Sequence, residues 1–179
     1  MLAASPALGA QTAPPRAPAP AASLEAAVGI HRVHGAIYRQ RYAPLVDAMI
    51  SARLVGGEQW ALVAAGGAML AGVGATGDVC ELLPQGGCAP EHNLIMFSAL
   101  VGPARRLSER TTAKLLVGPA SYRLQGETDW GMQARADLHF GLGAHWDIGP
   151  MTRITLLPRH RARNTIMWAA GGSLRWRTR

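Results

Sequence analysis

Long hydrophobic runs are missing from this sequence of 179 residues. No stretch reaches the roughly 18 uninterrupted apolar residues that a membrane-spanning helix requires, so a helical anchor is not predicted. The length suits one domain that buries a core or closes a small barrel. If the chain crosses a bilayer, it must do so as a closed β-barrel, because hydrocarbon offers no water to pair backbone N–H and C=O groups.

Lysine is nearly absent as well. Of the 18 basic residues only Lys114 is a lysine, and 11 acidic residues leave a formal net charge of +7. Such a charge indicates nucleic-acid binding when it gathers on one helix or patch. Here the arginines are spread through alternating apolar segments; examples are Arg39, Arg53, Arg105, Arg123, Arg135, Arg153, Arg163 and Arg175. Nucleic acid is therefore not an expected partner.

Only two cysteines are present, Cys80 and Cys88, and they bracket the segment ELLPQGG. A Pro/Gly-rich loop between two cysteines is typical of a disulfide formed in an oxidising compartment, and we predict this pairing. Free thiols and a metal site are the alternatives. A structural metal site needs four ligands at tighter spacing, and the nearby His92 does not complete one. We expect no metal ion and no cofactor.

The N-terminal region divides into two segments before the alternating pattern begins. Residues 1–10 resemble the end of a secretory signal peptide, with small residues at Ala7 and Ala10 but no basic start, so we expect the true start codon further upstream. A disordered leader is the alternative. Residues 11–22 are rich in proline and alanine and are expected to form an extended tether. A single barrel domain is expected over residues 23–177.

Apolar residues recur with period two through most of the remaining chain, which predicts strands and not helices. The alternating segments run over 24–30, 46–54, 59–70, 95–101, 112–117, 130–146, 152–157 and 165–176. The third is the least regular, because its alanines favour a helix while its glycines disfavour one. These segments predict an all-β fold, an eight-stranded antiparallel up-and-down barrel that spans a membrane.

The sixth segment is the longest and holds one apolar parity from Trp130 to Trp146. It exceeds the usual soluble strand and covers the roughly nine to eleven residues that a tilted transmembrane strand needs. A turn is expected directly after it, at Asp147-Ile148-Gly149-Pro150. Connections are expected to alternate between short turns and longer loops: short near 55–57, 103–110 and 148–150, longer near 35–42, 74–91, 120–129 and 159–163.

The two faces of these segments predict what faces lipid and what faces the interior. If the apolar parity faces lipid, a mixed-sign set of side chains collects in a lumen just wide enough for side chains to fill, and these charges must pair. This predicted lumen network comprises Glu25, Asp47, Arg53, Lys114, Arg135, Asp137, His139, Arg153 and Arg175. The tryptophans all fall on the apolar parity, near segment ends where interfacial girdles form: Trp60, Trp130, Trp146, Trp168 and Trp176.

The long alternating segment 130–146, the turn at 147–150 and the terminal segment TIMWAAGGSLRWR carry a family resemblance. Over about residues 23–177 the chain resembles the small outer-membrane β-barrel proteins of Gram-negative-type bacteria, with OmpA/OmpX-like architecture. The resemblance implies an outer-membrane location, contact with outer-membrane lipid and lipopolysaccharide, recognition by the barrel assembly machinery, and a monomer. In that family the last strand ends in an aromatic residue, whereas Arg177-Thr178-Arg179 follow Trp176 here.

The function expected from this resemblance is structural, adhesion-like or surface-interacting, with a plugged lumen and no catalytic residues. A secreted lipocalin-like barrel that binds a small apolar ligand is the first alternative, with its apolar parity facing a cavity and its polar parity facing water. A lipid A-modifying enzyme is the second alternative and needs a Ser/His pair at the external rim. The sequence pattern brings no such pair together; the residues near segment ends are His92, Ser108, Ser121 and His160.

Overall fold

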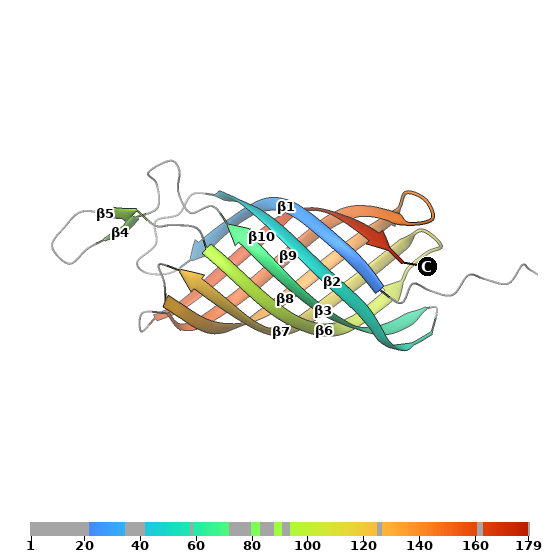
Figure 1. Ribbon diagram of the computed structural model, residues 1–179, viewed down its shortest axis with the longest axis horizontal. Coiled ribbons are helices and arrows are strands. Elements are labelled where there is room, and N and C mark those ends of the chain that lie inside the picture. The colour runs from blue at the N-terminus through green and yellow to red at the C-terminus, as the bar shows by residue number, and fades with distance from the viewer. Residues whose placement is uncertain are drawn as a thin grey trace, which may run out of the picture.

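The computed structural model describes residues 22–34, 42–57, 59–71, 80–82, 88–90, 94–124, 127–160 and 163–178. Within these residues eight antiparallel strands close into a barrel (Figure 1). They are β1 (Ala22–His34), β2 (Ala43–Gly56), β3 (Trp60–Ala71), β6 (Leu94–Arg106), β7 (Thr111–Leu124), β8 (Glu127–Gly141), β9 (Trp146–His160) and β10 (Arg163–Arg177). The predicted all-β up-and-down barrel is confirmed.

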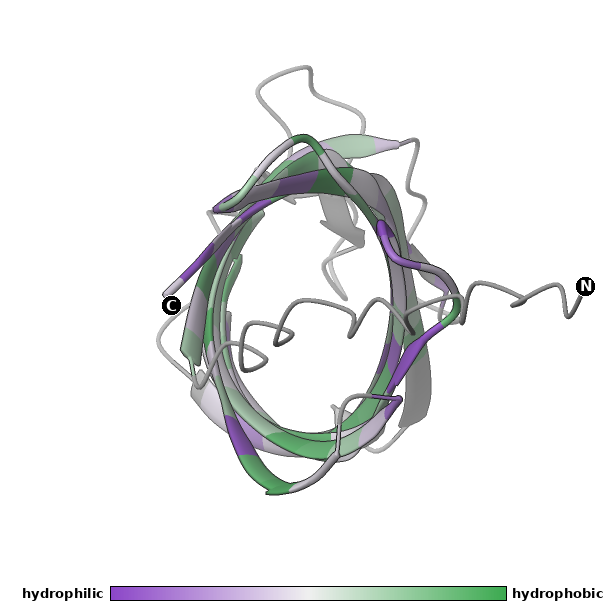
Figure 2. Ribbon diagram, turned by 90° about the vertical axis from the view of Figure 1, so that its right-hand side faces the viewer, coloured by the Kyte–Doolittle hydropathy of each residue, from purple (hydrophilic) through white to green (hydrophobic). Residues whose placement is uncertain are grey.

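Each barrel strand pairs with its neighbour in the chain, and β1 pairs with β10 to close the ring. The closing register places Leu24 opposite Trp176 and Val28 opposite Gly172. Viewed end-on, the strands form a continuous ring (Figure 2). Closure leaves no unpaired strand edge in the ring, the condition for crossing hydrocarbon with strands. None of the described residues belongs to a helix long and apolar enough to cross a bilayer.

The connections divide between the two ends of the barrel. At the end that we call the short-turn end, residues 57–59, 107–110 and 142–145 join strands, and both Ala22 and Arg177 lie there. At the opposite end, the loop end, the connections are residues 35–42, 72–93, 125–126 and 161–162. The longer connections expected near 120–129 and 159–163 are wrong, because β7 to β10 extend through most of those residues.

A small two-stranded sheet lies apart from the ring, within the connection 72–93 at the loop end (Figure 1). It consists of β4 (Cys80–Leu82) and β5 (Cys88–Pro90). The backbone register pairs Cys80 with Pro90 and Cys88 with Leu82, so the two cysteines are diagonal neighbours and not directly opposite. Their side chains lie outside the described residues, and the Cys80–Cys88 disulfide stays a prediction.

The boundary between β8 and β9 differs from the one that the alternation predicts. β8 ends at Gly141, residues 142–145 form a turn in which Gly143 has a φ of +156°, and Trp146 already begins β9. The expected turn at Asp147-Ile148-Gly149-Pro150 is therefore wrong, since these residues pair with β10 inside the sheet. The predicted inward and outward faces are nevertheless correct for both strands. The turn has four residues, an even number, so even-numbered residues face outward in β8 and in β9 alike.

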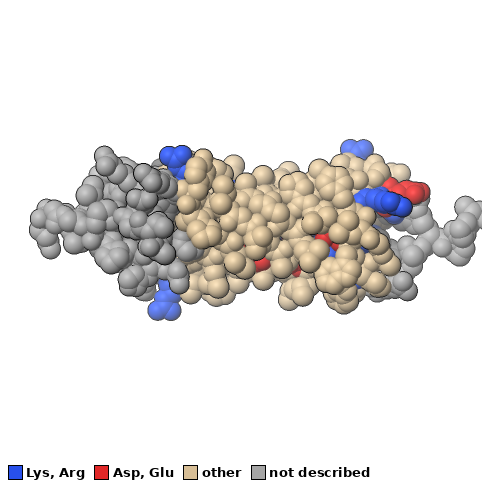
Figure 3. All heavy atoms as spheres, turned by 90° about the horizontal axis from the view of Figure 1, so that it is seen from above, with Lys and Arg blue, Asp and Glu red and all other residues tan. Residues whose placement is uncertain are grey.

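Burial alternates strictly along the strands, and the buried residues face the lumen. In β2, Leu45, Asp47 and Met49 are buried while the residues between them are exposed. Large apolar side chains cover the outside; Val28 and Ile50 are each 64% exposed. In the space-filling view basic side chains gather toward the two ends of the barrel, and the middle is largely uncharged (Figure 3). Exposing so large an apolar surface to water is unfavourable, whereas the hydrocarbon of a bilayer accommodates it.

The strands lie so close together that several inward-facing glycines, Gly149 among them, have no room for a side chain. At Gly149 in β9 a Cβ atom would lie 1.7 Å from the carbonyl oxygen of Leu138 in the neighbouring β8. Glycine at this position lets the two backbones approach as the sheet bends around the narrow lumen. The interior side chains described below are held at close range by this curvature.

Candidate functional site

The interior of the barrel holds most of the side chains that the polar parity predicts. Eight of the nine predicted lumen residues are buried in the described structure: Glu25 in β1, Asp47 in β2, Lys114 in β7, Arg135, Asp137 and His139 in β8, Arg153 in β9 and Arg175 in β10. The ninth, Arg53, faces inward at the short-turn end and is partly exposed. Charged groups thus come from six strands of the ring.

Arg135 lies at the centre of this interior network, which comprises these eight buried residues and Asp147. Its Nε donates to Asp137 Oδ1 at 2.9 Å, and its two terminal nitrogens bond the carboxylates of Glu25 and Asp47. β8 and β2 lie opposite each other in the ring, so the Arg135–Asp47 pair crosses the lumen. This ion pair holds the two opposite strands at a fixed distance across the lumen.

A second pair also spans the lumen, between β7 and β1, which are opposite in the strand order. Lys114 Nζ lies 2.7 Å from Glu25 Oε2 and 3.6 Å from Asp137 Oδ2. Arg153 Nη2 lies 2.7 Å from Asp47 Oδ2. Every buried carboxylate of this central group therefore has at least one cation within ion-pair distance, as the desolvation cost of a buried charge requires.

A third group lies toward the short-turn end and centres on Asp147. Arg175 Nε donates to Asp147 Oδ2 at 2.7 Å, and Arg177 Nη2 lies 3.1 Å from Asp147 Oδ1. Asp147 is 2% exposed, and the sequence pattern missed it because its neighbours read as a turn. The signal that was available is its parity, which matches that of Arg153 in the same strand.

The fully buried charges of the described lumen balance in sign. The acidic members are Glu25, Asp47, Asp137 and Asp147, and the basic members are Lys114, Arg135, Arg153 and Arg175. An equal number of each sign lowers the electrostatic cost of burial and lets the hydrogen bonds of each group be shared. No group of three His, Cys, Asp or Glu side chains in the described residues has an arrangement that would hold a metal ion.

One serine and one histidine meet inside the lumen, a pair that sequence analysis did not find. Ser173 Oγ lies 3.1 Å from His139 Nε2, and Glu25 Oε2 lies 3.5 Å from the same nitrogen. His139 is 0% and Ser173 2% exposed, so the pair has no contact with the membrane-facing surface. Among the candidates at segment ends, Ser108 lies in the turn 107–110 at the short-turn end, and His92 lies outside the described residues.

Apolar side chains fill the lumen beyond the charged network. One cluster reaches the loop end and includes Leu45, Met69, Met96, Tyr122 and Met167. Methionine is unbranched and adapts to irregular gaps, which suits an interior of curved walls. The lumen is thus occupied by ion pairs in its middle and by packed apolar groups toward the loop end.

Comparison with solved structures agrees with this architecture. The chain is similar to the attachment invasion locus protein Ail of Yersinia pestis, with a TM-score of 0.53 and 14% identity over 88% of this chain and 99% of Ail. It is also similar to Neisserial surface protein A, with a TM-score of 0.59 and 10% identity over 88% of this chain and 97% of that one. The chain has the fold of the small outer-membrane β-barrels. No family model and no curated protein matches the sequence.

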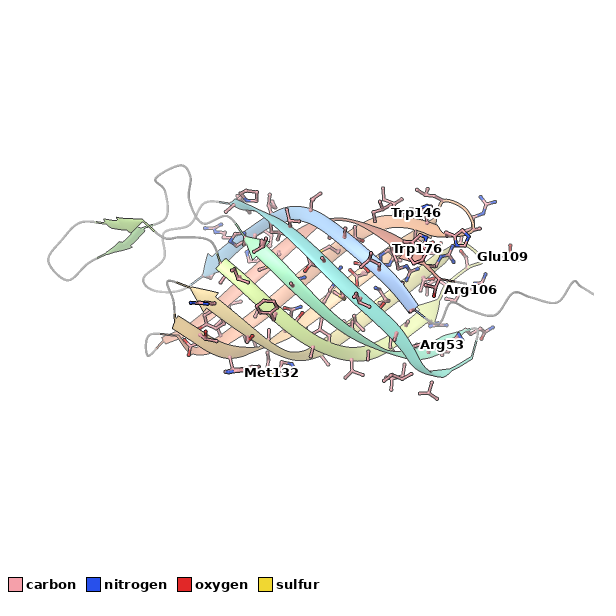
Figure 4. The ribbon with its side chains drawn as sticks, viewed as in Figure 1. Arg53, Arg106, Glu109, Met132, Trp146 and Trp176 are labelled. Carbon is pink, nitrogen blue, oxygen red and sulfur yellow. The ribbon has the colours of Figure 1, made fainter. Side chains whose placement is uncertain are left out.

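The tryptophans of this outer-membrane barrel fold lie on its outside, in two groups. Trp60, Trp146 and Trp176 are at the short-turn end, where Trp146 pairs with Trp176 across β9 and β10 (Figure 4). Trp60 lies under the guanidinium of Arg105, 4.9 Å from its ring centroid. Indole rings near strand ends are typical of the aromatic girdles of outer-membrane barrels.

The other two tryptophans, Trp130 and Trp168, lie toward the loop end. Trp130 is exposed, and Trp168 donates through Nε1 to His34 Nε2 at 2.9 Å and packs edge-on against Tyr42 at 5.6 Å. The barrel exterior therefore carries aromatic side chains near both ends, with aliphatic side chains between them.

Proposed function

We propose that this protein is an integral outer-membrane barrel with a structural, adhesion-like or surface-interaction role, a side-chain-plugged lumen and no enzymatic activity. The proposal depends on which side chains face outward. Large apolar side chains such as Val28 and Ile50 are exposed on the outside, whereas the charged side chains of Glu25, Asp47 and Arg135 are buried inside. A lipocalin-like barrel requires the opposite arrangement, with apolar side chains around a cavity and charges toward water. A lipid bilayer is the environment in which this apolar outer face is stable.

The asymmetry of the two ends supports an orientation. Outer-membrane barrels have short periplasmic turns and longer external loops, so the short-turn end belongs in the periplasm and the loop end outside the cell. The β4–β5 sheet then lies on the outer side of the membrane. The similar protein Ail is named for attachment and invasion and has been crystallised with the heparin analogue sucrose octasulfate, which supports a surface-interaction role.

The lumen supports a plugged and non-enzymatic barrel. The Arg135–Asp47 and Lys114–Glu25 pairs cross it, and their charges are compensated in place. A lipid A-modifying enzyme needs its nucleophile where an acyl chain can reach it. The Ser173–His139 pair is enclosed by the barrel wall and therefore does not favour this alternative.

The expected partners follow from the exterior. Outer-membrane lipid and lipopolysaccharide would cover the apolar belt, and the barrel assembly machinery would receive β10 with its terminal Trp176. A ring without free edges has no need of a second subunit, which supports a monomer. Nucleic acid is not among the proposed partners.

The first experiment is heat-modifiability after detergent extraction of the outer-membrane fraction. A folded barrel keeps its compact shape in cold detergent, so we expect different gel migration before and after boiling. Recovery of the protein in the soluble fraction without detergent, with identical migration, would overturn the membrane assignment.

The second experiment tests orientation on intact cells with trypsin. Residues 35–42 include Arg39 and Arg41 and belong to the loop end, whereas Arg110 belongs to the short-turn end. We expect cleavage after Arg39 or Arg41 in intact cells and cleavage after Arg110 only once the outer membrane is opened. The reverse order would show that the barrel faces the other way.

A further inference from the structure

The barrel opens at its short-turn end into a cavity of about 1120 Å³. It lies inside the ring, on the short-turn side of the central ion pairs. Residues near the short-turn ends of all eight barrel strands line it, together with residues of the turns that join them. Figure 4 shows Arg53, Arg106 and Glu109 at this end. Inward parity places Arg53, Arg106 and Arg177 as the last lumen-facing residues of β2, β6 and β10.

The side chains around this cavity are predominantly basic. The basic ones are Arg53, Arg106, Arg110, Lys114, Arg175 and Arg177, and the acidic ones are Glu109 and Asp147. The deepest cations are already paired, Lys114 with Glu25 and Arg175 with Asp147. The excess positive charge therefore lies at the rim, where a concave wall concentrates the electrostatic potential.

Each short turn holds one rim arginine by a backbone carbonyl. Arg53 Nη2 donates to Gly57 O at 2.9 Å, in the β2–β3 turn. Arg106 Nη2 donates to Glu109 O at 2.9 Å, in the β6–β7 turn. Arg177 Nη2 donates to Gly143 O at 3.0 Å, in the β8–β9 turn. These bonds fix the guanidinium groups through neutral carbonyl oxygens, and Arg177 also lies 3.1 Å from Asp147 Oδ1.

Several donors at the rim remain available. The hydrogen bonds of Arg53 and Arg106 described above are to turn carbonyls and not to carboxylates. Arg177 Nε is buried and has no hydrogen-bond partner among the described residues.

We propose that this mouth is a binding site for a small polyanion, a ligand with two or more phosphate or carboxylate groups, that enters from the short-turn side. Planar guanidinium groups bind both oxyanions through paired hydrogen bonds. Arginines held in advance by turn carbonyls lose little conformational freedom on binding, which favours affinity. The cavity has about the size of small-molecule sites and lies within the ring, so a small ligand suits it better than a folded partner.

The test is calorimetric titration of pyrophosphate and of citrate into the full chain, folded in a non-ionic detergent at low salt. The wild type is expected to bind at least one of them saturably, and neutral sucrose to give no heat. Arg53→Gln with Arg106→Gln is expected to weaken binding about tenfold or more. The matched control is Arg105→Gln, which removes a charge at the same end but on the outer face over Trp60, and should change affinity less than about twofold.

Heat-modifiable migration of each variant verifies folding before titration. If the double variant does not fold, Arg110→Gln takes its place, because the Arg110 side chain bonds no described residue, and a loss of about threefold is expected. The proposal is overturned by absence of saturable binding up to about 10 mM, or by an equal loss in Arg105→Gln. Either result leaves the membrane assignment intact, since extraction and heat-modifiability test that assignment separately.

Discussion

Arg135 illustrates how much of the interior depends on a single residue. Its guanidinium is shared among Glu25, Asp47 and Asp137, which come from three strands. Removing one partner of a buried ion pair destabilises a protein more than replacing the whole pair with apolar residues, because the remaining charge stays buried without a partner. In this lumen one substitution would leave three carboxylates with less compensation than they need.

We therefore predict that Arg135→Gln lowers the free energy of unfolding by about 3–5 kcal/mol. Urea unfolding of the barrel in lipid vesicles, followed by tryptophan fluorescence, measures the change. Arg105→Gln on the exterior is the control and should cost less than about 1 kcal/mol. Equal destabilisation by the two variants would contradict a central role for Arg135 in the network.

At residue scale, parity predicts which side chains point inward, and turn chemistry obscures some of them. Glu25, Lys114 and Arg153 could be placed in the lumen because charged residues stand at every second position of an apolar alternation. Asp147 could not, because Asp-Ile-Gly-Pro has the composition of a turn. The partners of each charge depend on strand order and register across the barrel, which parity alone does not contain.

Among the described glycines, Gly149 in β9 leaves the least room for a Cβ atom. A Cβ atom on Gly149 would overlap the carbonyl oxygen of Leu138, whereas at Gly172 in β10 nothing lies within 4 Å. We predict that Gly149→Ala reduces the folded fraction or destabilises the barrel by about 1–3 kcal/mol, while Gly172→Ala has little effect. Folded yield on unboiled gels and urea unfolding measure both. A tolerated Gly149→Ala would contradict the tight curvature of β9.

The limits of the elements were harder to predict than their number. The outward parity of β8 runs on through the turn 142–145 into Trp146, so no break in periodicity marks the end of the strand. Gly141 and Gly143 were visible in the sequence but suit both a bent strand and a turn. Pro150 suggested a turn, yet it lies opposite Gly172 within the sheet, on the exposed face of β9.

For the whole molecule, we predict that the wild-type barrel carries no measurable ion current in a planar bilayer, since ion pairs cross the middle of its lumen. Lys114→Ala with Arg135→Ala removes the cations of the Lys114–Glu25 and Arg135–Asp47 pairs, which cross the lumen, and should allow intermittent current. Single-channel recording of the two proteins at equal protein amounts makes the comparison. Wild-type current steps as large as those of the double variant would contradict a plugged lumen.

The pairing of β1 with β10 joins the first barrel residues to be synthesised with the last. Ala22 and Thr178 are hydrogen-bonded to each other, with Thr178 N donating to Ala22 O at 3.1 Å. During synthesis and export β1 must wait, with one edge unpaired, until the entire remaining chain has followed it. A chain that ends before β10 lacks the strand that pairs with β1 and leaves the ring open. Such a chain keeps an unpaired strand edge, and unpaired edges promote pairing with other chains.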